Sequence, residues 1–140
     1  ADITLNAKNG VYGKSAYDIP SVNLTQVAMN QEIVDGPAQI LCTLQDDVPK
    51  LYSCTVKRHS ESVFGGIQNL SVKITDSELL ENTGGIVQGM SGSPVLQNGK
   101  LIGAITHVLV DDPTTGYAVF AESMLDTAFS LTDLMLKEAG

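Results

Sequence analysis

The sequence predicts an all-β domain that closes into an antiparallel barrel. Short apolar or alternating runs recur along the chain, each bounded by Gly, Pro, Asn or Asp, which is typical of antiparallel strands. With 140 residues and a hydrophobic fraction of 43%, the chain is long enough to build the core of one domain. Closure into a barrel is favoured because it hides the edges of so many short strands.

The runs expected to form strands are separated by turn residues. Between the last two hairpin strands, Asn98 and Gly99 accept the positive φ that a two-residue turn requires, so we expect a tight hairpin there. The expected strands cover residues 10–17, 24–30, 37–44, 50–57, 67–75, 93–97, 101–110 and 116–120.

Two segments are expected to be helical. Thr75 is followed three positions later by Glu78, the pattern of a capping box, which predicts a short helical turn over residues 75–80. In residues 121–139, apolar side chains recur at helical spacing, so we expect one face of this helix to pack on the barrel. The residues on this face are Ala121, Met124, Leu125, Ala128 and Phe129.

The charge and hydropathy of the chain argue against two kinds of partner. Eight Lys and Arg against sixteen Asp and Glu give a formal net charge of −8, so a nucleic acid would be repelled. No stretch of about 18 apolar residues is present, so no transmembrane segment is expected in this chain. The start of the chain has no signal-peptide pattern, and both ends are compatible with a piece cut from a longer, exported protein.

The two cysteines cannot form a zinc site by themselves and lack the close spacing of a redox pair. If residues 38–45 and 50–57 form a hairpin with a register centred near Val48, Cys42 lies directly opposite Cys54. A disulfide is possible at that cross-strand distance. Two buried free thiols are an equally acceptable alternative.

The stretch GMSGSP, residues 89–94, has the composition of a turn that presents a nucleophile. Gly89 and Gly92 flank Ser91, and in such a turn the N–H groups of Gly89 and Ser91 point into one concavity, as an oxyanion site requires. The alternative is an ordinary turn whose serines form only local hydrogen bonds. The motif alone favours the ordinary turn.

The sequence around the motif favours the catalytic interpretation instead. GMSGSP followed by a hairpin with NGK resembles the GDSGGP region of chymotrypsin-like serine peptidases, with Ser91 at the nucleophile position. The order of ITDSELL, the serine loop, LIGAITHV and GYAVFAESMLDTAF also matches that fold. Residues 73–125 are similar to the C-terminal part of peptidase family S55, the stage IV sporulation protein B type, from endospore-forming bacteria.

The resemblance implies a chymotrypsin-like barrel, a peptide or protein substrate, and no metal or organic cofactor. It gives Asp76 a catalytic or orienting role, although a carboxylate in the first turn of a helix is also expected for structural reasons. It places the strand around Thr106 and His107 at the edge that binds extended substrate. Ser93 is expected to support the turn, while Met90 removes the ion-pair anchor that digestive relatives form with an Asp.

The general base is not evident. The family's histidine lies upstream in an ALGH-type motif that this chain does not contain. His59 is expected to be solvated, and His107 is either a base near Ser91 or a packed strand residue. We therefore expect residues 1–140 to be the C-terminal, nucleophile-bearing portion of an S55 domain. Without the upstream histidine-bearing part and PDZ domain, it should be poorly active or inactive alone.

The same resemblance implies a cellular role. Family members are exported to the intermembrane space around the forespore and cleave a membrane-complex subunit, which activates late sigma-factor processing. The competing hypothesis is a non-catalytic β-barrel module that captures a peptide or partner. Asn23 and Asn69 satisfy the glycosylation sequon but have no expected role in a bacterial protein. Asp111 and Asp112 are expected to form a turn.

Overall fold

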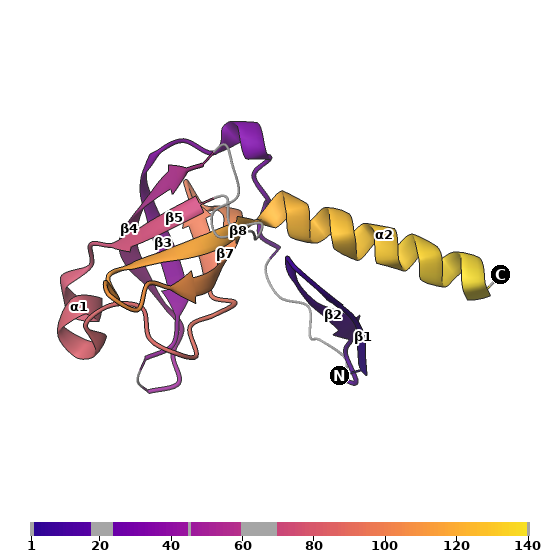
Figure 1. The fold of residues 1–140 in the computed structure, drawn as a ribbon, viewed down its shortest axis with the longest axis horizontal. Coiled ribbons are helices and arrows are strands. Elements are labelled where there is room, and N and C mark those ends of the chain that lie inside the picture. Colours follow the sequence, from indigo (N-terminus) through magenta and orange to yellow (C-terminus); the bar gives the residue numbers. More distant parts are fainter. Residues whose placement is uncertain (1, 18–23, 45, 60–69, 140) are drawn as a thin grey trace.

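The computed structural model describes residues 2–17, 24–44, 46–59 and 70–139 (Figure 1). Asn23, Asn69 and the first part of the expected strand 67–75 lie outside these residues. The elements are β1 Asp2–Ala7, β2 Gly10–Lys14, a 3-10 turn at Asn30–Glu32, β3 Gly36–Cys42, β4 Lys50–Arg58, β5 Leu70–Ile74, α1 Ser77–Thr83, β6 Pro94–Gln97, β7 Lys100–Val108, β8 Thr115–Phe120 and α2 Ala121–Ala139.

Strands β3 to β8 form a closed antiparallel barrel in the order β3-β4-β5-β8-β7-β6, with β6 returning to β3. The predicted fold class is therefore confirmed. Alternate residues of β3 to β6 face the core, as in β4, where Tyr52, Cys54 and Val56 are buried between exposed neighbours. Strands β7 and β8 contain consecutive buried residues. The core continues through Val72, Val95 and the other buried aliphatic residues of the barrel.

The predicted hairpin between β6 and β7 is also confirmed. Gln97 pairs with Lys100, and the two loop residues Asn98 and Gly99 have φ values of 53° and 75°. The Gln97 side chain lies at the seam where the barrel closes. Its amide oxygen accepts from the Val34 N–H, and its amide nitrogen donates to the carbonyls of Val34 and Pro37.

The predicted register of the β3–β4 hairpin is wrong. Cys42 pairs with Lys50, and Cys54 pairs with Ala38, so the cysteines are not opposite each other. Because Cys42 lies four positions beyond Ala38, the two Cα atoms are about 13 Å apart, too far for a disulfide. Both thiols are free. The register follows the turn, in which Asp46 adopts a positive φ of 61°.

The N-terminal part of the chain differs from the sequence prediction. Strand β1 was not expected, yet it pairs with β2 in a separate two-stranded sheet. The run 24–30 was expected to be a strand, but within it only Val27 forms an isolated bridge, with Leu101.

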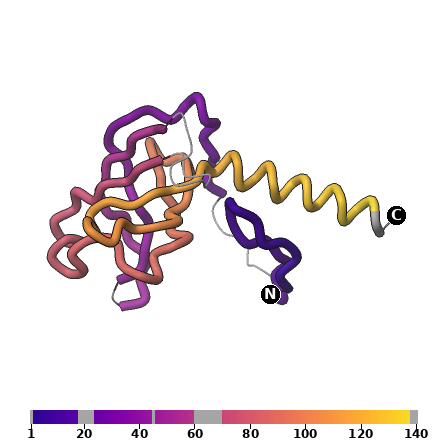
Figure 2. The backbone as a smooth tube through the Cα atoms, in the orientation of Figure 1, coloured from indigo at the N-terminus to yellow at the C-terminus, as the bar shows by residue number. Residues whose placement is uncertain are grey.

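Helix α2 has the predicted bounds, but most of its length does not pack on the barrel. Ala121 is buried where the helix leaves β8, whereas Phe129 is 63% exposed. The helix projects away from the barrel, and the β1–β2 hairpin lies beside it (Figures 1 and 2). The Asn9 side chain joins the two by donating to the Ser123 carbonyl and the Thr127 hydroxyl.

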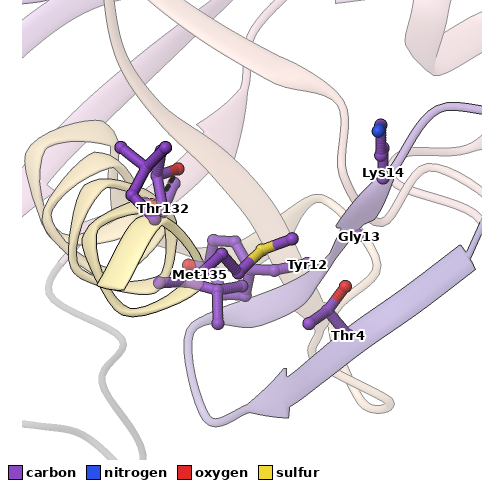
Figure 3. Close-up of a pocket in the computed structure, with 9 residues that line it drawn as sticks. Thr4, Tyr12, Gly13, Lys14, Thr132 and Met135 are labelled. Atoms are coloured by element: carbon purple, nitrogen blue, oxygen red, sulfur yellow. Dashed lines mark hydrogen bonds between the residues drawn. The ribbon is translucent and has the colours of Figure 1, made fainter. Parts of the chain in front are cut away.

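A hollow of about 440 Å³ lies between the helix and the hairpin and is lined by residues of both, among them Tyr12 of β2 and Met135 of α2 (Figure 3). The apolar face of α2 is therefore shared between the hairpin and solvent. Among the described residues, no helix is both long and apolar enough to cross a membrane.

Candidate active site

The turn that carries Ser91 connects α1 to β6 and holds the serine at the surface. Gly89 and Gly92 have φ values of 102° and 91°, a region that favours glycine. Two backbone hydrogen bonds fix the turn to β7: the Gly92 N–H donates to the Ile105 carbonyl at 2.7 Å, and the Ile105 N–H donates to the Ser93 carbonyl at 3.0 Å. The Ser91 side chain is therefore held on an ordered turn.

The N–H groups of this turn fall into two sets. Those of Met90, Gly92 and Ser93 donate to the carbonyls of Val87, Ile105 and Met90. Among the described residues, the N–H groups of Gly89 and Ser91 meet no acceptor.

These are the two donors that the sequence predicted for an oxyanion. A Cβ on Gly89 would meet nothing within 4 Å, so the space beside the Gly89 backbone is open. Two such amides beside a serine can bind the negative charge that develops on an attacked carbonyl.

The Met90 side chain anchors the turn from below. It is 7% exposed and belongs to the barrel core. Its sulfur accepts a weak hydrogen bond from the Val87 N–H, with a nitrogen–sulfur distance of 3.4 Å. Burial of an apolar side chain thus stabilises the turn at the position where digestive relatives carry an Asp.

The Ser91 hydroxyl donates to the carbonyl of Thr106, with an oxygen–oxygen distance of 3.1 Å. Thr106 lies at a β-bulge in β7, between Ile105 and His107, where the register with β8 shifts. The Thr106 hydroxyl in turn donates to the Tyr117 carbonyl at 3.2 Å. The bulge brings this part of β7 to the serine turn.

Two hollows flank the serine turn. One, of about 350 Å³, is lined by Ser91, Thr106, His107 and several aliphatic residues, so it joins the serine to the predicted substrate-binding edge. The other, of about 610 Å³, is lined by residues that include Gly89 and Cys42. An extended peptide that crosses Ser91 has room for side chains on both sides of the turn.

Asp76 is the N-cap of α1, one position after the Thr75 cap that the sequence predicted. Its carboxylate accepts hydrogen bonds from the N–H groups of Ser53, Glu78 and Leu79, and none from Ser91. The bond from Ser53 is the largest cause that lowers the pKa of Asp76. The two helix N–H groups add to it, while partial burial opposes it. This geometry accounts for the structural role, and the catalytic role stays a prediction.

The two histidines lie in different surroundings. His107 is exposed on β7 and lines the hollow with Ser91. His59 follows β4 and is half-buried, and its Nε2 atom is buried without a hydrogen-bond partner among the described residues. The expectation that His59 is solvated is therefore wrong.

Other polar groups have structural roles. Asp112 accepts hydrogen bonds from Thr114 and Thr115, which makes the predicted turn before β8. Burial raises the pKa of the Cys54 thiol to about 12 and also raises that of Cys42. Within the described ranges, no three His, Cys, Asp or Glu side chains cluster in a way that could hold a metal ion.

A closed six-stranded antiparallel barrel that presents a serine on a glycine turn is the framework of chymotrypsin-like serine peptidases. Comparison with known families gives the narrower assignment: the chain belongs to the SpoIVB peptidase S55 family, whose model matches residues 1–125. The match covers the barrel and the serine turn, includes the β1–β2 hairpin, and stops within α2. No curated protein matches the chain.

Membership makes this a serine peptidase of the SpoIVB type with a protein substrate, and the family's name associates it with sporulation. The sequence resemblance is strong from about residue 73 and less specific upstream, and the family match extends it over the whole barrel.

Proposed function

We propose that Ser91 is the nucleophile of an endopeptidase and that the N–H groups of Gly89 and Ser91 bind the oxyanion. The observation that carries this proposal is the exposed serine beside two amide donors that have no acceptor, on a turn in which the N–H groups of Met90, Gly92 and Ser93 are all hydrogen-bonded. The Ser91 hydroxyl attacks the substrate carbonyl, and the resulting oxyanion is stabilised by the two amides. The strand at Thr106 and His107 pairs with the extended substrate.

The general base belongs, in this proposal, to an upstream part of the peptidase domain. The Ser91 hydroxyl donates to a backbone carbonyl, which cannot accept its proton during attack. The 140-residue chain is then the nucleophile-bearing portion and is inactive or poorly active alone. Asp76 completes the site by orienting the base.

The proposed biological role rests on the family. We assign to the complete enzyme the cleavage of a membrane-complex subunit that activates late sigma-factor processing. This reaction takes place after export, in the space around the forespore. The family assignment supports a serine peptidase with a protein substrate.

A fluorophosphonate probe tests the proposal because it reacts with an activated serine. We expect labelling of the complete enzyme that is lost in Ser91→Ala and retained in Ser93→Ala, the matched hydroxyl of the same turn. The 140-residue chain alone should label weakly or not at all. Equal labelling of Ser91→Ala and the unmodified complete enzyme would sink the assignment of the nucleophile.

A non-catalytic module that captures a peptide is the second candidate. The donation of the Ser91 hydroxyl to Thr106 favours it, because that hydroxyl is not activated as it stands. Complete absence of labelling in both the complete enzyme and the 140-residue chain would support the module.

A further inference from the structure

The hollow of about 350 Å³ beside Ser91, here called the Ile86 hollow, has a composition that selects among substrates. Its aliphatic residues are Ile86, Val87, Ile105 and Val108. Ile86 and Ile105 are 3% and 2% exposed and still line the hollow, so they form its deepest part. The hollow therefore has an apolar floor and the serine at its rim.

The floor is fixed rather than adaptable. The Ile86 N–H donates to the Pro113 carbonyl at 2.7 Å, which pins the segment before the serine turn to the loop before β8. Gly116 of β8 lies directly against the Ile86 side chain, because a Cβ at this glycine would be 2.7 Å from Ile86 Cδ1. Ile86 thus occupies the space that a side chain at position 116 would otherwise take.

The floor formed by Ile86 and Ile105 carries no charge, and the polar residues that line the hollow are Gln88, Ser91, Thr106 and His107. None of the residues that line it is Asp, Glu, Lys or Arg. A lysine or aspartate side chain that reached the floor would lose water without gaining an opposite charge, which is strongly unfavourable. An aliphatic side chain would instead remove its own surface and that of the floor from water.

We infer that the Ile86 hollow receives the side chain of the P1 residue, the one whose carbonyl Ser91 attacks. It accepts uncharged aliphatic side chains, and Ile86 sets the size limit. This inference rests on the proposed function, because it places the scissile carbonyl at Ser91. The hollow shares Thr106 and His107 with the predicted substrate edge, whereas the larger hollow on the Gly89 side is left for residues after the scissile bond.

Methyl NMR of the 140-residue chain tests the inference without requiring catalysis. Acetylated tripeptide acids that differ only in the last residue, which is Val, Leu, Phe, Lys or Asp, are titrated into the protein. We expect saturable shifts of the Ile86, Ile105 and Val108 methyls, with dissociation constants for Val or Leu at least about tenfold below those for Lys or Asp. Equal affinities, preference for a charged residue, no saturable shift, or shifts confined to other methyls would each overturn it.

Substitution of the floor gives the second readout. Ile86→Ala should reverse the order of affinity of the Val and Phe peptides, so that the Phe peptide binds more tightly, because the shorter side chain makes the hollow deeper. Ile74→Ala is the matched control, since Ile74 is equally buried but does not line the hollow, and it should keep the original order. If Ile86→Ala does not fold, Ile86→Val should shift the preference towards Leu and Phe. An unchanged order in a folded Ile86 variant would contradict the inference.

The fluorophosphonate experiment separates this inference from the proposed function. If Ser91 is labelled but the peptides bind without selectivity, the peptidase proposal is supported and the inferred preference for aliphatic P1 residues is contradicted. Selective binding in the hollow without labelling of the complete enzyme means that the peptidase proposal falls, while the selectivity of the hollow stands.

Discussion

At position 76, one carboxylate holds two elements together. It caps α1 by accepting from Glu78 and Leu79, and it also accepts from the Ser53 N–H in β4. A residue with this geometry can be kept for structure, for catalysis, or for both. Substitutions that separate the hydrogen-bonding role from the negative charge can distinguish these roles.

Asp76→Ala should lower the free energy of unfolding by about 1–2 kcal/mol, because the helix loses its cap and Ser53 loses an acceptor. Asp76→Asn keeps one acceptor oxygen for the two helix N–H groups but loses the second, which accepts from Ser53, so it should cost about half as much as Asp76→Ala. Urea unfolding measures both. If Asp76 also orients the base, the Asn variant of the complete enzyme loses activity while it remains stable. Equal destabilisation by Ala and Asn would contradict the capping role.

The same residue predicts a dependence of stability on pH. Its pKa is lowered in the folded state, so its contribution is fully present above the unfolded value of about 3.9 and is lost as the pH falls through the folded value. Between about pH 5 and pH 2, the urea midpoint should therefore fall further for the unmodified chain than for Asp76→Asn. Parallel curves for the two proteins would show that Asp76 does not contribute.

At the scale of elements, the β3–β4 pairing determines the behaviour of the cysteines. Its register separates them, and burial raises both thiol pKa values. We expect iodoacetamide at pH 8 to alkylate the half-buried Cys42 faster than Cys54, because the thiolate is the reacting form. Mass spectrometry should show both sites modified at similar rates in urea. A chain that is resistant at both sites until it is reduced would indicate a disulfide.

The stability of the serine turn should depend more on the buried Met90 side chain than on Ser91 itself. Met90→Ala should lower the free energy of unfolding by about 2–4 kcal/mol, because it leaves a cavity under the turn. Ser91→Ala, at an exposed position, should change it by less than about 0.5 kcal/mol. Thermal or urea unfolding of both variants provides the comparison. A stable Met90→Ala variant would mean that the bonds to β7 are sufficient to hold the turn.

At the scale of the whole molecule, we expect the pair formed by α2 and the β1–β2 hairpin to be less stable than the barrel, because most of α2 projects away from the barrel core. Asn9→Ala removes the side-chain bonds that join hairpin and helix. Hydrogen exchange should then accelerate in β1, β2 and the distal turns of α2, while amides of β4 and β7 keep their protection. Uniform acceleration across the barrel would show that the two units unfold together.

The sequence could predict the features that depend on nearby residues. Asn98 and Gly99 specify their own turn, residues 121–139 carry the helical period, and the flanking glycines place Ser91. Features set by distant contacts were missed. The amphipathic pattern of α2 indicates that its apolar face packs against another element, but it does not indicate which one. The β1–β2 hairpin beside the helix was therefore not predicted.

The errors at the other elements have the same origin. The observed β3–β4 register is centred on the turn at Asp46, which has a positive φ; the alternation of the strands fits a register centred on Val48 equally well, so the pattern could not choose between them. The candidate oxyanion donors could be predicted because they follow from the turn itself. The floor of the Ile86 hollow depends on the contact between Ile86 and Gly116, two residues far apart in the sequence.

The seam at Gln97 has a consequence for the newly made chain. This side chain reaches a carbonyl 60 residues earlier, and contacts at such separation are slow to form. The serine turn directly precedes β6, the strand that completes this seam, so we expect the turn to acquire its shape only when the barrel closes. We expect newly made chains to be unable to cleave other proteins until the barrel has closed. Proteolysis by the complete enzyme would then begin only after a delay that follows synthesis.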